Sequence, residues 1–171
     1  ENFIDELHAN FNCPQLACDE RSLGTTIELA SGQTETVSAE LSPGAEINGT
    51  LTRSDTSETI ASATIRVWDE VGNFVASTRV NAATGQYVLA GLVAGEYKLR
   101  VDTFGNDDRY IDQLYDGIQC VDFCDPVDGA TISLSEAERR TINMTLQRGL
   151  VISGRVSDEA DSSIPVEEGW V

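Results

Sequence analysis

The cysteines are the residues of this sequence with the clearest chemistry. They form two close pairs, Cys13 with Cys18 and Cys120 with Cys124, and the single histidine is His8. Short pairs of this kind favour local disulfides, which persist in oxidising compartments. Zinc held by four thiolates is the alternative, and it would require both pairs to meet at one site. We therefore predict two small disulfide loops in an extracellular or cell-surface protein.

The other reactive side chains do not form a recognisable catalytic set. A nucleophile needs a base within reach, and the chain has one histidine. Asp107, Asp108, Asp112 and Asp116 could supply paired carboxylates for glycoside hydrolysis, but their spacing singles out no general acid. The acidic stretch 102–116 could instead hold calcium through several oxygens, although it matches no EF-hand. We predict no enzyme activity and no cofactor, with solvated loop carboxylates as the main interpretation and calcium as the alternative.

Two further residue types could mark modification or binding. Asn48 and Asn143 begin N-x-T sequons and are candidate glycosylation sites. Trp68 and Trp170 are candidate interface residues, because exposed aromatics stack on sugar rings or anchor contacts between modules. Covering of Trp68 by a loop of its own module is the structural alternative.

Composition excludes several classes of function. Asp and Glu number 29 against 11 Lys and Arg, which gives a formal charge of −18. Such a surface repels phosphate backbones and anionic lipids, so we predict no nucleic-acid partner. No apolar run has membrane-spanning length and no leader pattern begins at Glu1, so we expect no membrane insertion of these residues. With 40% apolar and 6% aromatic residues, a thin core fits better than a cavity lined with rings.

An internal repeat organises the chain. Residues 3–8 (FIDELH) return 107 positions later as 110–115 (YIDQLY), and 24–29 (GTTIEL) return 105 positions later as 129–134 (GATISL). A period of this size is a whole domain. The other matching stretches share alternating apolar residues: Val37, Ala39 and Leu41 with Ile142, Met144 and Leu146, and residues 47–51 with 152–156.

The repeat predicts three parts of the chain. Residues 1–42 are expected to be the C-terminal part of a preceding module, 43–149 a complete module, and 150–171 the first strands of a following one. We favour a segment of a longer array, because neither end contains a counterpart of residues 85–101. Mutual completion of the two partial modules between neighbouring subunits is the alternative.

Short strand signals separated by turn residues predict an all-β fold. Apolar residues such as Tyr97, Leu99 and Val101 alternate with polar ones, which is typical of one buried face. We expect tandem two-sheet β-sandwiches of immunoglobulin or transthyretin type, with residues 103–129 as a long polar excursion held by the second cysteine pair. The predicted strands are 47–52, 63–69, 74–80, 86–90, 96–102, 130–134 and 140–146.

Five stretches carry a family resemblance: 47–50 (INGT), 63–67 (ATIRV), 84–89 (TGQYVL), 91–95 (GLVAG) and 96–101 (EYKLRV). Through them the chain resembles the carboxypeptidase regulatory-like domain of secreted bacterial proteins. This is a transthyretin-like or prealbumin-like sandwich, related in architecture to the Cna-B-like repeats of Gram-positive surface proteins. The resemblance implies a spacer, stalk, adhesive or accessory domain, and the catalytic zinc domain of carboxypeptidases has no counterpart here.

The resemblance to surface-protein repeats raises an isopeptide bond as a further chemistry. Lys98 is the only lysine, and its place between Tyr97 and Leu99 is expected to point it away from the core, which argues against such a bond. Our leading hypothesis is a non-catalytic structural module of an extracellular fibre, stalk or adhesin that contacts neighbouring modules or copies of itself and assembles into filaments. The alternative is a carbohydrate- or protein-binding accessory module attached to a secreted enzyme.

Overall fold

The computed structural model describes residues 2–8, 11–13, 24–60, 62–103, 110–121, 124–150 and 157. Its elements are twelve strands and one short 3-10 helix, all short and separated by turns. In chain order they are β1 (Asp5–Leu7), β2 (Phe11–Cys13), β3 (Ala45–Arg53), β4 (Thr64–Asp69), β5 (Phe74–Arg79), β6 (Gln86–Leu92), β7 (Gly95–Asp102), β8 (Asp112–Leu114), β9 (Ile118–Cys120), η1 (Pro126–Asp128), β10 (Ile132–Leu134), β11 (Arg139–Thr141) and β12 (Met144–Leu146).

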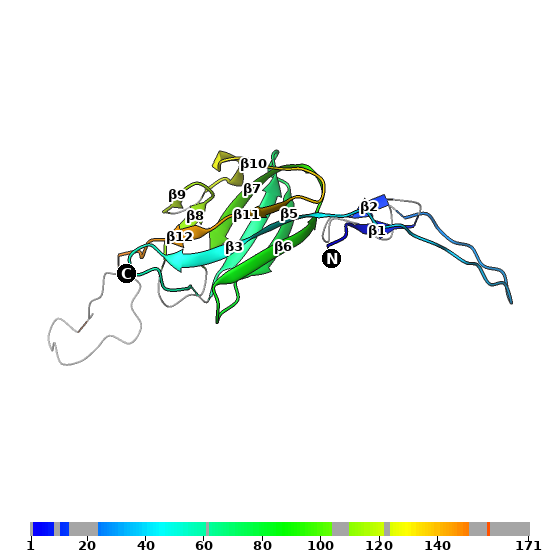
Figure 1. Ribbon diagram of the computed structural model, residues 1–171, viewed down its shortest axis with the longest axis horizontal. Coiled ribbons are helices and arrows are strands. Elements are labelled where there is room, and N and C mark those ends of the chain that lie inside the picture. The colour runs from blue at the N-terminus through cyan, green and yellow to red at the C-terminus, as the bar shows by residue number, and fades with distance from the viewer. Residues whose placement is uncertain are drawn as a thin grey trace.

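Two sheets pack against each other as a β-sandwich, which confirms the predicted all-β fold class (Figure 1). One sheet has the order β5-β4-β7-β8-β9. Strand β10 pairs with the same edge of β7 as β8 does, but at the start of β7, whereas β8 pairs near its end. The second sheet contains β6, β3 and the strands β11 and β12, which both run parallel to β3. None of the described residues belongs to a helix with the length and hydropathy of a transmembrane span.

The core lies between the two sheets and follows the alternation of apolar residues. In β4, Ile65 and Val67 are fully buried while Arg66 between them is exposed. Leu99 of β7 pairs with Val67, so the two central strands of the first sheet present one apolar surface. Burial of each such side chain contributes about 1.5–3 kcal/mol. The pattern therefore fixes which face of each strand points inward.

Gly49 of β3 is required by close packing within the second sheet. A Cβ at this position would lie 1.7 Å from the carbonyl oxygen of Ile142, between β11 and β12. Tyr87 of the neighbouring strand β6 donates a 2.6 Å hydrogen bond to the same oxygen. Ile142, at the break between β11 and β12, is therefore closely packed against both β3 and β6.

The structure corrects two details of the predicted strands. The stretch 103–129, predicted as a long polar excursion without strands, contains the hairpin β8–β9, which extends the first sheet beside β7. The predicted strand 140–146 is two strands, β11 and β12. The first difference arises because edge strands of three residues are too short for their alternation to stand out from a loop. The second arises because the Thr50 N–H donates to the side chain of Asn143, which interrupts the backbone pairing with β3 between β11 and β12.

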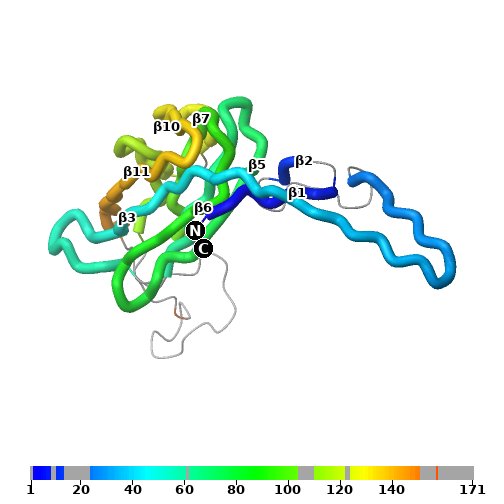
Figure 2. The backbone as a smooth tube through the Cα atoms, turned by 45° about the vertical axis from the view of Figure 1, so that its right-hand side comes forward, coloured from blue at the N-terminus to red at the C-terminus, as the bar shows by residue number. Residues whose placement is uncertain are grey.

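The N-terminal part of the chain lies beside the sandwich and extends away from it (Figures 1 and 2). It contains the hairpin β1–β2 and then residues 24–42, to which no strand is assigned. We refer to residues 24–42 as the closing segment. Its two extended arms, joined by a turn between Ala30 and Gln33, form the long projection coloured blue in both views.

Candidate functional site at the junction end of the sandwich

The N-terminal part joins the sandwich by backbone pairing. Phe3 and Pro43 form an antiparallel bridge, flanked by a 2.9 Å hydrogen bond from the Ile4 N–H to the Ser42 carbonyl. Strand β3 begins two residues after Pro43. The connection between the closing segment and the sandwich is therefore a paired strand end.

Close packing tightens this junction. The Gly44 N–H donates to the Asn2 carbonyl at 2.9 Å, and the Asn2 side chain donates to the buried carboxylate of Glu46. Glu46 also accepts a 2.9 Å hydrogen bond from the Asn48 side chain. A Cβ on Gly44 would lie 2.6 Å from the Cα of Gly91, which itself has a φ of +72°. Glycine at both positions allows the two backbones to approach this closely.

Matching contacts occur at the opposite end of the sandwich. Tyr110 and Arg148 form an antiparallel bridge, flanked by a 2.9 Å hydrogen bond from the Ile111 N–H to the Gln147 carbonyl. These residues correspond to the bridge residues of the junction at the spacing of the sequence repeat. The same pairing thus occurs twice, 105 to 107 positions apart.

The two short hairpins have identical registers. Each hairpin is a pair of three-residue antiparallel strands that ends at a cysteine. The paired residues are Asp5 with Cys13, Glu6 with Asn12 and Leu7 with Phe11 in β1–β2, and Asp112 with Cys120, Gln113 with Gln119 and Leu114 with Ile118 in β8–β9. Every pair is shifted by 107 positions.

Two turns after the hairpins also share their hydrogen bonding. The Gln33 side chain accepts a 3.2 Å hydrogen bond from the Ala30 N–H, and the Glu138 side chain accepts a 2.8 Å bond from the Ser135 N–H. A backbone bond closes each turn between the same residues. The sequence comparison did not reveal this match, because Gln and Glu differ in type although both supply the same acceptor oxygen.

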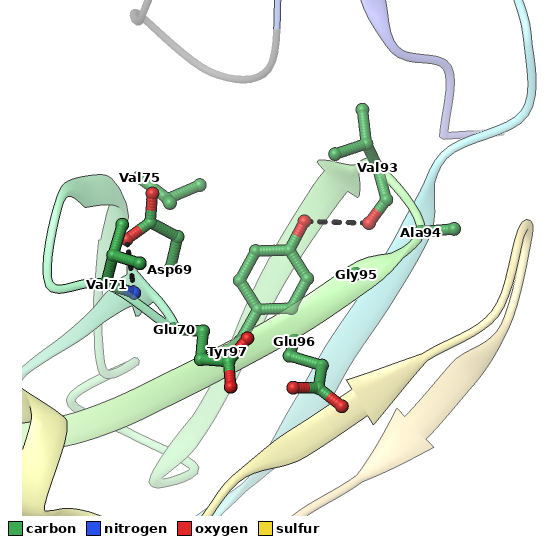
Figure 3. Close-up of a pocket in the computed structure, with 9 residues that line it drawn as sticks. All are labelled: Asp69, Glu70, Val71, Val75, Val93, Ala94, Gly95, Glu96 and Tyr97. Carbon is green, nitrogen blue, oxygen red and sulfur yellow. Dashed lines mark hydrogen bonds between the residues drawn. The ribbon is translucent and has the colours of Figure 1, made fainter.

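An open groove of about 410 Å³ lies beside the junction (Figure 3). It is formed by the turn between β4 and β5 and the turn between β6 and β7, and its walls are mainly aliphatic. Its lining residues are Asp69, Glu70, Val71, Val75, Val93, Ala94, Gly95, Glu96 and Tyr97. These residues offer apolar contact and negative charge, and no nucleophile with a base beside it. The groove can therefore accept an aliphatic group that carries a positive charge.

Hydrogen bonds of Tyr97 and Asp69 hold the two turns that line the groove. The Tyr97 hydroxyl donates a 2.7 Å hydrogen bond to the Val93 carbonyl, as the dashed line in Figure 3 shows. Burial raises the pKa of Tyr97, and the nearby Asp69 charge adds to this rise. Partial burial opposes ionisation of Asp69, but hydrogen bonds from the Asn73 side chain and from loop N–H groups hold its pKa below the usual value. Sequence reasoning missed this groove because its residues come from two separate turns.

A network of charges covers the outer face of the first sheet. The two carboxylate oxygens of Asp102 lie 2.7 Å from the Nε atoms of Arg66 and Arg100. The Nη2 atom of Arg100 also donates a 3.1 Å hydrogen bond to Asp112. Asp112 further accepts hydrogen bonds of 2.8 Å from the backbone and the hydroxyl of Thr103. Burial raises the pKa of Asp102 against the pull of both arginines, and the neighbouring Asp112 adds to the rise. The network ties the start of the 103–129 stretch to the sheet.

These contacts bear on the calcium and hydrolase alternatives. Asp102 and Asp112 face arginines, Asp116 is exposed, and Asp107 and Asp108 lie outside the described residues. Within the described part of the chain, no group of three or more acidic, histidine or cysteine side chains could hold a metal ion. His8 is exposed, with its Nδ1 3.3 Å from the Thr25 carbonyl.

Lys98 points to the outer face of the sheet but is buried there. Its ammonium group donates to the Gly129 carbonyl at 2.7 Å and to the Thr131 hydroxyl at 2.9 Å. The stretch after η1 therefore covers the lysine. Both partners are neutral oxygen acceptors, so hydrogen bonds to a loop hold the Lys98 ammonium group.

The described cysteines are in disulfides. Cys120 and Cys124 are bonded to each other with their Cα atoms 5.4 Å apart, which places a small loop directly after β9. The alternative prediction, a zinc site that includes these two thiolates, is therefore wrong. Cys13 is also disulfide-bonded, and Cys18 lies outside the described residues.

The two sequons lie opposite each other across β3 and the strand edge beside it. Asn48 is engaged on both sides, since its Nδ2 donates to Glu46 and its Oδ1 accepts from Thr141 at 2.9 Å. Asn143 is exposed, and its Oδ1 accepts 3.0 Å hydrogen bonds from the N–H and hydroxyl of Thr50. Of the two, Asn143 has the better access for a glycan.

Trp68 is partly exposed at the outer face of the first sheet. Its ring contacts Phe74 edge-to-face, with ring centroids 6.1 Å apart at 79°. A bulge between Val67 and Trp68 sets this pairing. Trp170, the other candidate interface residue, lies outside the described residues. The structure thus places Trp68 away from the groove lining.

Comparison with known proteins gives distant structural similarities. No protein-family model and no curated protein matches the chain. The fold is similar to that of a candidate carbohydrate-binding protein from Bacteroides uniformis ATCC 8492, at 15% identity and a TM-score of 0.40 over 61% of this chain and 41% of that one. It is similar to the pilus 2b backbone protein of group B streptococcus, at 17% identity and a TM-score of 0.41 over the same shares of the two chains.

A third similar structure is chlorocatechol 1,2-dioxygenase from Pseudomonas putida, at 17% identity and a TM-score of 0.37. The match covers 67% of this chain and 64% of that one. The chain thus spans less than half of the first two proteins and less than two thirds of the third.

Proposed function

We propose that this chain is a non-catalytic structural module of an extracellular or cell-surface fibre, stalk or adhesin, built from tandem sandwiches of the carboxypeptidase regulatory-like type. One observation carries the proposal. Residues 2–43 repeat the bridge, the hairpin register and the turn of residues 110–148. Repetition of hydrogen bonds at a spacing of 105 to 107 positions is expected of successive copies of one domain. In this proposal 1–42 end one module, 43–149 form the next, and 150–171 begin a third.

The junction supports a stiff connection between the modules. Flexible linkers are stretches of unpaired polar chain. Here the bridge between Phe3 and Pro43 and the contact between Gly44 and Gly91 leave no such stretch between Ser42 and β3. A series of sandwiches joined in this way forms a rod, which suits a spacer or stalk.

The disulfide and the acidic composition support an extracellular location of the module. The bond between Cys120 and Cys124 would be reduced in most cytosolic environments. The charge of −18 keeps exposed strand edges of neighbouring copies apart and maintains solubility. Contacts in a fibre would then be made end to end, through the surfaces near the junction.

Small-angle X-ray scattering tests the rod. We would compare chains of one, two and three modules with matched chains that carry a six-residue Gly-Ser insertion between Ser42 and Pro43 and its equivalents. The longest dimension should grow in proportion to the module number in the unmodified series and more slowly in the inserted one. Equal growth in both series would refute the stiff junction. Filaments of the longest chain in electron micrographs would support assembly, and dispersed monomers would count against it.

The groove favours a second candidate function, an accessory module that binds a protein or a sugar. Its aliphatic walls and acidic rim are open to solvent beside Tyr97. The aromatic pair of Trp68 and Phe74 offers a separate surface on the outer sheet. Binding of glycans that is lost in Trp68→Ala, or of cationic peptides that is lost in Val71→Lys, would support this function. Equal binding by both variants and the unmodified chain would exclude it.

A further inference from the structure

The closing segment exposes apolar side chains whose repeat counterparts are buried. Ile27 and Leu29 are 43% and 58% exposed, and Val37 and Leu41 are each 45% exposed. We refer to these four residues as the apolar stripe. Their counterparts in the sandwich are at most 4% exposed: Ile132, Leu134, Ile142 and Leu146. Equivalent apolar side chains are thus exposed in the closing segment and buried in the core of the sandwich.

The sandwich shows which elements cover the counterparts. Strand β10 pairs antiparallel with β7, where Ile132 lies opposite Tyr97 and Leu134 opposite Gly95. Strand β12 runs parallel to β3, where Leu146 lies opposite Arg53. The turn between Ser135 and Glu138 therefore carries the chain from one sheet to the other and closes the sandwich. The closing segment has the same turn and lacks both partner strands.

We propose that the apolar stripe is the docking face for two strands equivalent to β3 and β7, supplied by a preceding sandwich of the same polypeptide. This inference rests on the proposed tandem order and specifies its contacts. The arm with Ile27 and Leu29 pairs antiparallel with the β7 equivalent, and the arm with Val37 and Leu41 pairs parallel with the β3 equivalent. The docked segment then ends at the junction beside Pro43.

The described strands exclude a folded second copy as the occupant. In the part of the chain that the structure describes, β3 lies between β6 and the β11–β12 edge, and β7 lies between β4 and the β8–β10 edge. Both strands are thus paired on both sides and have no place for another segment. The apolar stripe therefore needs strands equivalent to β3 and β7 that are not already paired with another closing segment.

An extended chain tests the docking. Residues 43–108 would be placed directly before Asn2, which restores the order of a complete module because Asn2 corresponds to Arg109 in the repeat. Hydrogen exchange of amides in 25–29 and 37–41 would be compared between the original and extended chains. Amides that join a sheet and a core exchange more slowly. We expect exchange at least about tenfold slower in the extended chain.

Three variants of the extended chain serve as controls. Leu29→Asp should restore fast exchange in the closing segment and leave residues 45–103 of the second module unchanged. Glu28→Gln, on the neighbouring and opposite-facing position, should keep the slow exchange. Gly49→Ala in the added segment alone should abolish the protection, because it disrupts the β3 equivalent.

The outcomes separate this inference from the proposed function. Slower exchange that Leu29→Asp reverses supports the docking. Unchanged exchange in the extended chain overturns it, whether the added residues fold apart or stay unfolded. X-ray scattering of the same sample reports the rod independently, so a stiff two-module particle with an unprotected stripe would refute the docking and keep the tandem rod.

Discussion

Gly32 and Ala137 hold the same place in two equivalent turns, and both have a positive φ, +82° and +56°. Each is the third residue of a turn closed by the same backbone and side-chain hydrogen bonds. Glycine adopts this conformation without cost, whereas alanine pays about 1 kcal/mol. The turn geometry is therefore kept at Ala137 although the residue type does not favour it.

Replacing this alanine should stabilise the sandwich. Ala137→Gly removes the left-handed strain, and the larger entropy of glycine in the unfolded chain offsets part of the gain. We expect the free energy of unfolding to rise by about 0.5 kcal/mol in urea titrations. Ala94→Gly, at an exposed position without positive φ, is the control and should not stabilise. A loss of stability in Ala137→Gly would show that the turn is unstrained.

Gly49→Ala should strongly destabilise the sandwich. The new Cβ would meet the Ile142 carbonyl at 1.7 Å, so β3 or the β11–β12 edge would have to move. We expect a loss of about 3 kcal/mol or more, at the upper end of overpacking effects. Gly95→Ala is the matched control, because its Cβ would make ordinary contacts of 3.6 Å or longer with Tyr97. Urea unfolding of both variants measures the difference, and equal losses would contradict the close packing at Gly49.

Asp69 should contribute stability that depends on pH. Its folded-state pKa lies below the unfolded value, because hydrogen bonds from Asn73 and loop N–H groups outweigh partial burial. The stabilisation is therefore full above the unfolded pKa of about 3.9 and is lost as pH falls through the lower folded pKa. The difference in unfolding free energy between the unmodified chain and Asp69→Asn should shrink as pH falls from 6 toward about 3. Glu70→Gln in the same loop is the control, and a difference for Asp69→Asn that stays constant with pH would disprove this role.

The second disulfide should stabilise the sandwich only modestly. Cys120 and Cys124 are four positions apart, and a loop this small restricts the unfolded chain little. The chain-entropy relation gives about 2 kcal/mol for the bond. Cys120→Ser with Cys124→Ser should therefore still fold, with a lower urea midpoint and the same β-sheet circular dichroism. An unfolded double variant would show that the disulfide is essential for the β8–β9 region.

The central strands could be predicted from the sequence, whereas the edges and the groove could not. Residues such as Ile65 and Val67 alternate over a long buried strand, so the period of two is unmistakable. Three-residue strands such as β8 and β9 carry too few alternations, and pairing with β7 decides their structure. The contact between Gly44 and Gly91 depends on residues far apart in sequence. The repeat revealed which segments correspond. The exposure of the apolar stripe in the closing segment depends on which strands lie beside it, and the sequence does not specify this.

Residual dipolar couplings of the chain would show whether the junction between the two repeated units is stiff. Amide couplings of the β1–β2 hairpin and of β3, β4 and β7 would be measured in one alignment medium. A stiff junction requires that a single alignment tensor fits both sets. Separate tensors, with a smaller magnitude for the hairpin, would mean that the two parts move independently and that the junction is flexible.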